Sequence, residues 1–179
     1  IWQTLHVMVG SEALTSPIET WERAEILFVT ESFWRHVEET VSALGVALVI
    51  AIFGGALFGM ILGLNRRAGE VFAPMFVALQ STPKVTLYPV MLLFFGLGFS
   101  AKVAFGAIHG IIPMTLITYN AMRSINPALV RTAKTLRMSY WQTFPLIYVP
   151  ATIPELVTAT RLSFSITFLG VMIGEMFAS

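Results

Sequence analysis

Residues 41–64 read VSALGVALVIAIFGGALFGMILGL, a run of 24 residues without a charged side chain. A helix needs about 20 apolar residues to cross about 30 Å of hydrocarbon. Strands of membrane barrels alternate apolar and polar residues over only about 10 positions, and this run shows no such alternation. The run therefore predicts a membrane-spanning helix, and the fold class that follows is an all-α membrane protein, a polytopic helical bundle.

The rest of the composition agrees with a membrane location. Only 12% of the 179 residues are charged and 56% are hydrophobic, and the charged fraction is about half of that in soluble domains. These values exclude an ordinary soluble enzyme and a disordered chain. A net charge of +1 provides no excess of basic residues that could neutralise the phosphates of a nucleic acid. Further spans are expected at residues 85–101, 103–122 and 153–177.

Prolines divide the region that leads into the second span. Pro74, Pro83 and Pro89 interrupt residues 71–101, and proline removes a backbone donor from a helix. We expect residues 71–80 to form a short helix near the cytoplasmic surface, followed by the span proper from Pro83 to Leu97.

Charged loops give the orientation. Residues 11–39 hold seven glutamates against two arginines. Arg66-Arg67 follow the first span, and residues 123–140 hold four basic residues and no acid. The excess of Lys and Arg in cytoplasmic loops places both basic loops inside. Residues 1–40 are then an outer interfacial segment, with the end of a preceding span, and residues 41–179 form the core.

Because the chain starts at Ile1 and stops within an apolar stretch, we expect a piece of a longer protein.

Small residues recur every four positions within the first span. They are Ala47, Ala51, Gly55, Gly59 and Gly63. A ridge of small side chains lets a second helix approach closely in lipid, where no hydrophobic force drives helices together. We interpret this stripe as helix packing.

No motif for chemistry is present. The sequence has no cysteine, no aspartate, no phosphate-binding loop and no metal-ligand spacing among its three histidines. We therefore expect no enzyme activity, no cofactor and no metal. The ionisable or polar residues within the spans remain candidates for a translocation path. They are His109, Asn120, Arg161 and Glu175. The structural alternatives are a hydrogen-bonded interior histidine and pairing of the charges with segments outside this sequence.

Residues 123–154 carry the most specific pattern. Asn126-Pro127 is a helix start with an N-cap followed by proline, and Ser139-x-x-Gln142 is a capping box that opens a second helix. Leu129, Ala133 and Leu136 fall on one face of the first helix. The pattern predicts a short amphipathic helix, a tight turn and a second helix on the basic side.

This segment resembles the cytoplasmic motif of permease subunits of binding-protein-dependent ABC importers. That motif is Glu-Ala-Ala, three residues, Gly, nine residues and Ile-x-Leu-Pro. Here Ala133, Ile147 and Pro150 match it. Four positions depart from it, namely Arg131, Thr132, Arg137 and Val149. The flanking residues are similar to the nitrate/sulfonate/taurine branch; they are Phe95-Gly96-Leu97-Gly98, Tyr119-Asn120, Arg123-Ser124, Asn126-Pro127, Arg161 and Glu175-Met176.

The resemblance implies a subunit that imports a small solute across the bacterial plasma (inner) membrane. In the family the loop is a coupling helix that docks on a cytoplasmic ATPase dimer. The implied contact residues are Leu129, Arg131, Thr132, Ala133, Leu136, Arg137 and Ser139. We expect the apolar stripe to enter the ATPase groove, with Arg131 and Lys134 at its edge. Arg137 replaces a glycine that would end the helix in the left-handed region, so either it adopts that conformation at a cost or the helix ends differently.

The other implied partners are a periplasmic or extracellular solute-binding protein, a second permease copy that makes a homodimer, and membrane lipids; no nucleic acid is expected. Two alternatives remain open at this point, a membrane scaffold and a secondary transporter, each with a helix that rests on the lipid surface.

Overall fold

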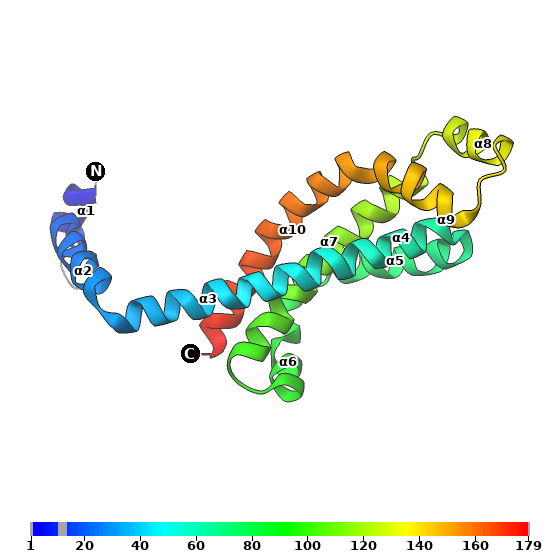
Figure 1. Cartoon of the computed structure of the whole chain (residues 1–179). Helices are drawn as coiled ribbons and strands as arrows, with labels where there is room; N and C mark the ends of the chain where they lie inside the picture. Colours follow the sequence, from blue (N-terminus) through cyan, green and yellow to red (C-terminus); the bar gives the residue numbers. More distant parts are fainter. Residues whose placement is uncertain (1, 11–13, 179) are drawn as a thin grey trace. The chain divides into compact units, whose positions relative to one another are not determined.

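The computed structural model describes residues 2–10 and 14–178, and these residues form helices without strands (Figure 1). Glu12 of the acidic segment lies outside the described residues. The chain divides into two units, Ile1–Val41 and Ser42–Ser179. Three helical runs of the described residues are long and apolar enough to cross a membrane, namely Glu31–Leu64, Phe99–Arg123 and Tyr140–Phe177.

The first unit contains α1 (Trp2–Val9), α2 (Pro17–Val29) and the start of α3 (Glu31–Val49). Helix α2 begins with a capping box, in which Ser16 Oγ accepts from the Glu19 amide and Glu19 Oε2 accepts from the Ser16 amide, each at 3.2 Å. Trp21 is exposed on α2 and donates from Nε1 to Glu25 at 2.7 Å. Aromatic residues with one polar atom are typical of membrane interfaces.

The second unit is built around one central helix, α7 (Phe99–Arg123). A π-helical segment at Ile50–Gly54 joins α3 to α4 (Gly55–Leu64), and α4 packs along one side of α7. The long C-terminal helix α10 (Val149–Ala178) packs along another side (Figure 1). Fifteen residues of α7 are buried, so this helix is the core of the unit.

The small-residue stripe lies directly against α7. A Cβ added at Gly59 would come 2.5 Å from Thr118 Cβ and 2.6 Å from the Thr115 carbonyl oxygen. Gly55 faces Met114 and Gly63 faces Met122 in the same way. On the α3 side, Ala47 and Ala51 touch Gly106 and Gly110. Every pair is 59 residues apart in sequence, so the two helices run parallel in one register.

The return crossing differs from the one expected from sequence. Helix α5 (Arg66–Ser81) starts beside the end of α7, where Gly69 packs on the Tyr119 ring. A 3₁₀ turn, Lys84–Leu87, leads into α6 (Tyr88–Phe95), whose Tyr88 ring lies 5.1 Å from the Phe105 ring near the start of α7. Tyr119 and Phe105 are 14 positions apart, about 21 Å along a helix.

Helix α5 therefore runs back along α7, and α6 is a helix of only eight residues. The structure differs here from the expected short helix at residues 71–80 and from the expected span from Pro83 to Leu97 (and over 85–101). The physical reason is the placement of charge within α5. Arg66, Arg67 and Glu70 all lie in its first turns, so residues 71–81 carry no charge. Helix α6 stops at Phe95 because Gly96 and Gly98 adopt φ angles of 70° and 108°, which favour glycine.

The first prediction concerns the contact between α4 and α7. Gly59→Ala forces the added methyl group into backbone and a β-branched side chain, so we expect unfolding to become easier by about 1–3 kcal/mol. A Cβ at Gly45 on α3 would meet nothing within 4 Å, so Gly45→Ala should leave stability unchanged or raise it by up to about 1 kcal/mol. Thermal unfolding of both purified variants in detergent measures the difference. Equal midpoints would contradict the packing described here.

Candidate functional site

The basic loop begins with a short helix whose start is fixed by two residues. Helix α8 spans Pro127–Thr135, and the Asn126 side chain accepts a hydrogen bond from the Ala128 amide at 2.9 Å. The predicted N-cap with proline at the first helical position is thus confirmed. A proline there costs no hydrogen bond, because the first amides of a helix have no partner within it.

The end of α8 is closed by a left-handed arginine. Arg137 has a φ of 52°. Its amide donates to the Lys134 carbonyl, and the Met138 amide donates to the Ala133 carbonyl, both at 3.0 Å. These two bonds make a Schellman motif, in which glycine is the usual residue at this position. Arg137 therefore adopts the left-handed conformation, the first of the two outcomes considered from sequence.

The two sides of α8 differ in character. Leu129 and Leu136 are exposed, with 45% and 67% of their surface accessible, and Thr132 lies between them on the helix. Ala133 is only 3% exposed. Ala133 is thus packed within its own chain, which leaves little of its surface for the ATPase contact expected from sequence.

The opposite side of α8 faces the ends of two core helices. Arg131 and Lys134 line a groove together with Leu64 of α4 and Arg123 of α7. Both side chains are exposed, and their expected place at the edge of a partner contact stays a prediction.

Ser139 starts the helix that leads back into the core. Its amide donates to Gln142 Oε1 at 2.9 Å, as the predicted capping box requires. Helix α9 (Tyr140–Thr143) continues through a π-helical segment, Phe144–Tyr148, into α10 without a break. The loop is thus rigidly capped at both of its helix starts.

His109 of α7 is a packed interior residue. Its Nδ1 donates to the Phe105 carbonyl at 2.8 Å, and its ring lies 4.4 Å from the Phe105 ring. Gly170 of α10 packs directly on the imidazole. These contacts account for the histidine as a structural residue, which was the alternative considered from sequence.

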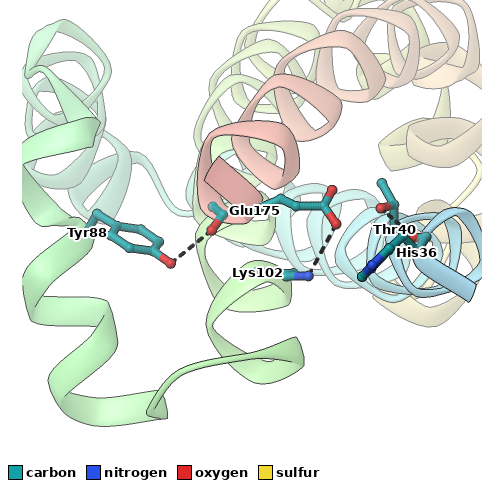
Figure 2. Close-up of polar contacts among 6 residues, drawn as sticks. His36, Thr40, Tyr88, Lys102 and Glu175 are labelled. Carbon is teal, nitrogen blue, oxygen red and sulfur yellow. Dashed lines mark hydrogen bonds and ion pairs between the residues drawn. The ribbon is translucent and has the colours of Figure 1, made fainter. Parts of the chain in front are cut away.

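Glu175 is paired within this chain. Its carboxylate accepts from Lys102 Nζ at 3.2 Å (Figure 2), and the Lys102 side chain is 8% exposed. Beside this pair, the Tyr88 hydroxyl donates to the Gly174 carbonyl at 2.9 Å (Figure 2). Sequence reasoning missed Lys102 and Tyr88 as partners, because nothing in the sequence links positions 73 or 86 residues away.

Arg161 projects from the side of α10 that faces away from α7. Thr158 and Ser165 lie on the same exposed face, and the Ser165 hydroxyl donates to the Arg161 carbonyl at 3.4 Å. Ser163 and Thr167 are buried on the other face. Of the four path candidates, only Arg161 and Asn120 are exposed, and the structure does not bring the four together.

The comparisons with known proteins agree with this geometry. Residues 51–179, which begin within the first span and include α4 to α10, match the family described as binding-protein-dependent transport system inner membrane component. The chain belongs to this family. It is a transport permease and not an enzyme, and it is a multi-pass protein of the plasma membrane.

Several curated relatives match nearly the whole permease chain. The formylaminopyrimidine transport permease protein ThiX of Halalkalibacterium halodurans is 29% identical over 177 residues, 98% of this chain and 70% of ThiX. The putative aliphatic sulfonates transport permease protein SsuC of Bacillus subtilis is 22% identical over 100% of this chain and 66% of its own length. The carnitine transport permease protein OpuCD of Listeria monocytogenes is 26% identical over 82% of this chain and 66% of its own length.

The permease loop yields a second prediction, at Arg137. Glycine removes the steric conflict of a Cβ in the left-handed region, which costs roughly 1–2 kcal/mol for other residues. Arg137→Gly should therefore slow hydrogen exchange of the Met138 amide by about five-fold, given about 1.4 kcal/mol per ten-fold change. Arg137→Val, with a branched Cβ, should accelerate that exchange. Identical exchange in the two variants would contradict the left-handed turn.

Proposed function

We propose that this chain lines the path of an ABC importer for a small anionic solute and transmits ATP-driven motion through α8. ATP would be hydrolysed by a separate cytoplasmic ATPase dimer, because the sequence has no phosphate-binding loop. A solute-binding protein would deliver the solute at the outer end. A second permease copy would complete the path.

The exposed side of α8 carries the proposal for coupling. Leu129, Thr132 and Leu136 form an outward face on a helix whose start and end are both fixed by hydrogen bonds. Exposed apolar side chains on a rigid helix are a common feature of partner-binding surfaces. We infer that this face, without Ala133, meets the ATPase.

The exposed face of α10 carries the proposal for the path. An arginine at the centre of a membrane helix costs about 2.5–3.5 kcal/mol on the insertion scale. Thr167 and Ala51 both pack on Gly110, which places the middle of α10 level with the middle of α3–α4. Arg161 is about 1.7 turns from Thr167 and about 120° around the helix from it, on the exposed side. A polar face at this depth is expected to line water or a second subunit.

The charge of Arg161 supports an anionic solute. Among residues 2–10 and 14–178, no hydrogen bond or ion pair of its guanidinium is found, whereas Glu175 is paired with Lys102. Arginine binds carboxylates, sulfonates and other planar or tetrahedral anions through several donors at once. Nitrate, sulfonates and taurine carry such groups. The relatives' names cover other solutes too, so the argument rests on Arg161.

The third prediction tests coupling at α8. Leu136 is exposed, so Leu136→Asp should leave the permease folded while placing an unpaired charge in the proposed contact. Buried unpaired charges cost about 3–5 kcal/mol, so binding of the ATPase should fall by two to three orders of magnitude. Thr135→Asp adds the same charge about 100° around the helix and should have a much smaller effect.

Co-purification of the ATPase with each membrane-inserted variant, together with solute uptake, measures this effect. Full ATPase binding by Leu136→Asp would refute the proposed contact and favour the alternative in which α8 rests on lipid.

The fourth prediction tests the path and its charge together. The sequence contains no cysteine, so a single cysteine can replace Ser165 beside Arg161. We expect Ser165→Cys to react with a water-soluble thiosulfonate at least about 100-fold faster than Phe53→Cys, because a thiolate in hydrocarbon is costly. Phe53 is 72% exposed on an entirely apolar face, at the depth of Ser165.

A sulfonate-bearing reagent should react with Ser165→Cys about five-fold faster than a trimethylammonium reagent, after correction for free thiol, because Arg161 attracts the anion. Arg161→Gln should abolish this preference and Arg161→Lys should keep it. Equal labelling of the two positions would count against a water-filled path, and a preference unchanged in Arg161→Gln would count against the anion site.

A further inference from the structure

A groove lies between α8 and the ends of α4 and α7. Its volume is about 360 Å³. Three cationic side chains line it, Arg123 from α7 and Arg131 and Lys134 from α8. Leu64, Met122 and Val130 line its apolar part. The groove therefore combines a positive side with an apolar side.

No acidic side chain lines this groove, and residues 123–154 contain no Asp or Glu. Glu70, at the same end of the core, is held by Arg66 at 2.8 Å and is also attracted, more weakly, by Arg123. Within the described part of the chain, the charged groups of Arg123, Arg131 and Lys134 make no ion pair and no hydrogen bond. These three cations are exposed and converge on one groove, while Glu70 is already paired with Arg66, so the groove favours an anionic ligand.

The groove lies where the membrane helices end. Each residue of the small-residue stripe contacts the α7 residue 59 positions later. By the same offset, Leu64 lies level with Arg123. Leu64 is the last residue of α4, and Asn65-Arg66-Arg67 follow it. Both helices thus pass from apolar to basic at one level, the level of lipid headgroups. Basic pockets between membrane helices at a cytoplasmic surface are sites for phosphate-bearing headgroups.

We propose that this groove binds the phosphate of an anionic membrane lipid, with Arg123, Arg131 and Lys134 as its ligands and the apolar residues beside the acyl chains. The inference goes beyond the proposed function and does not depend on the identity of the ATPase or the solute. It makes α8 a two-sided helix, with a lipid on its basic inner side and Leu129 and Leu136 left free for a protein. It also gives a role to Arg131, which stands where the motif of similar permeases has glutamate.

Native mass spectrometry of the delipidated, full-length permease tests the proposal directly. The protein is titrated with phosphatidylglycerol and, separately, with phosphatidylcholine of the same acyl chains. Each cation near a membrane surface contributes about five-fold to anionic lipid affinity. Replacing Arg123, Arg131 and Lys134 together by Gln should therefore weaken phosphatidylglycerol binding by about 100-fold and leave phosphatidylcholine binding unchanged.

Two controls keep the result interpretable. Arg137→Gln removes a cation from the same loop that does not line the groove, and it should retain wild-type binding of phosphatidylglycerol. Exchanging Arg131 and Arg123 for Lys and Lys134 for Arg keeps the charge, so this variant should also bind, even if the triple Gln variant fails to fold. Loss of binding in Arg137→Gln as well, or in the charge-preserving variant, would overturn the assignment to these three residues.

Three further outcomes separate the possible occupants. Equal binding of phosphatidylglycerol by wild type and the triple variant would refute the site. Displacement of the lipid by millimolar inorganic phosphate would assign the groove to a soluble anion and overturn the lipid assignment. Loss of ATPase co-purification in the triple variant, with lipid binding intact, would make the groove a protein contact and also overturn it. Leu136→Asp tests the coupling proposal separately, because Leu136 lies on the other side of α8.

Discussion

The close approach of α4 to α7 is the contact on which the arrangement of the core depends. Glycine backbone at positions 55, 59 and 63 lies against Met114, Thr118 and Met122, which only residues without a side chain permit. Lipid supplies no hydrophobic force between helices, so such contacts hold the bundle together by packing. Because the register is fixed along the whole stripe, α4 and α7 end at one level, and the basic loop starts there.

The same central helix decides which side of α10 is left for function. Gly106 and Gly110 of α7 receive Val171 and Thr167, so the buried face of α10 is set by packing. The opposite face is excluded from the core and carries Thr158, Arg161 and Ser165. Helix α10 has polar residues on both sides. Packing on α7 makes one side structural, and the other side is the one proposed to line the translocation path. At its other end, the pair of Lys102 and Glu175 joins α7 to α10.

The features predicted well from sequence are those that local chemistry decides. The charge-free run at 41–64 and the caps at Asn126 and Ser139 each depend on residues within a few positions. For Arg137 the sequence left two outcomes open, and the structure shows the left-handed one. Three features depend on partners far along the chain and were not predicted from sequence. They are the course of α5 along α7, the burial of Ala133, and the pairing of Glu175 with Lys102. A hydropathy pattern favours the most apolar segment as the span. The contact of Gly69 with the Tyr119 ring shows instead which segment runs along α7.

The central claim is that the capped basic loop lies in the cytoplasm, where an ATPase reaches it, while the turn before α7 lies outside. Single cysteines at Ser100 and Thr132, both exposed, test this claim in intact cells with a membrane-impermeant thiol reagent. The account predicts that the reagent labels Ser100→Cys from outside and labels Thr132→Cys only after the membrane is opened. Labelling of Thr132→Cys in intact cells would contradict the orientation, the coupling role of α8 and the site proposed beneath it.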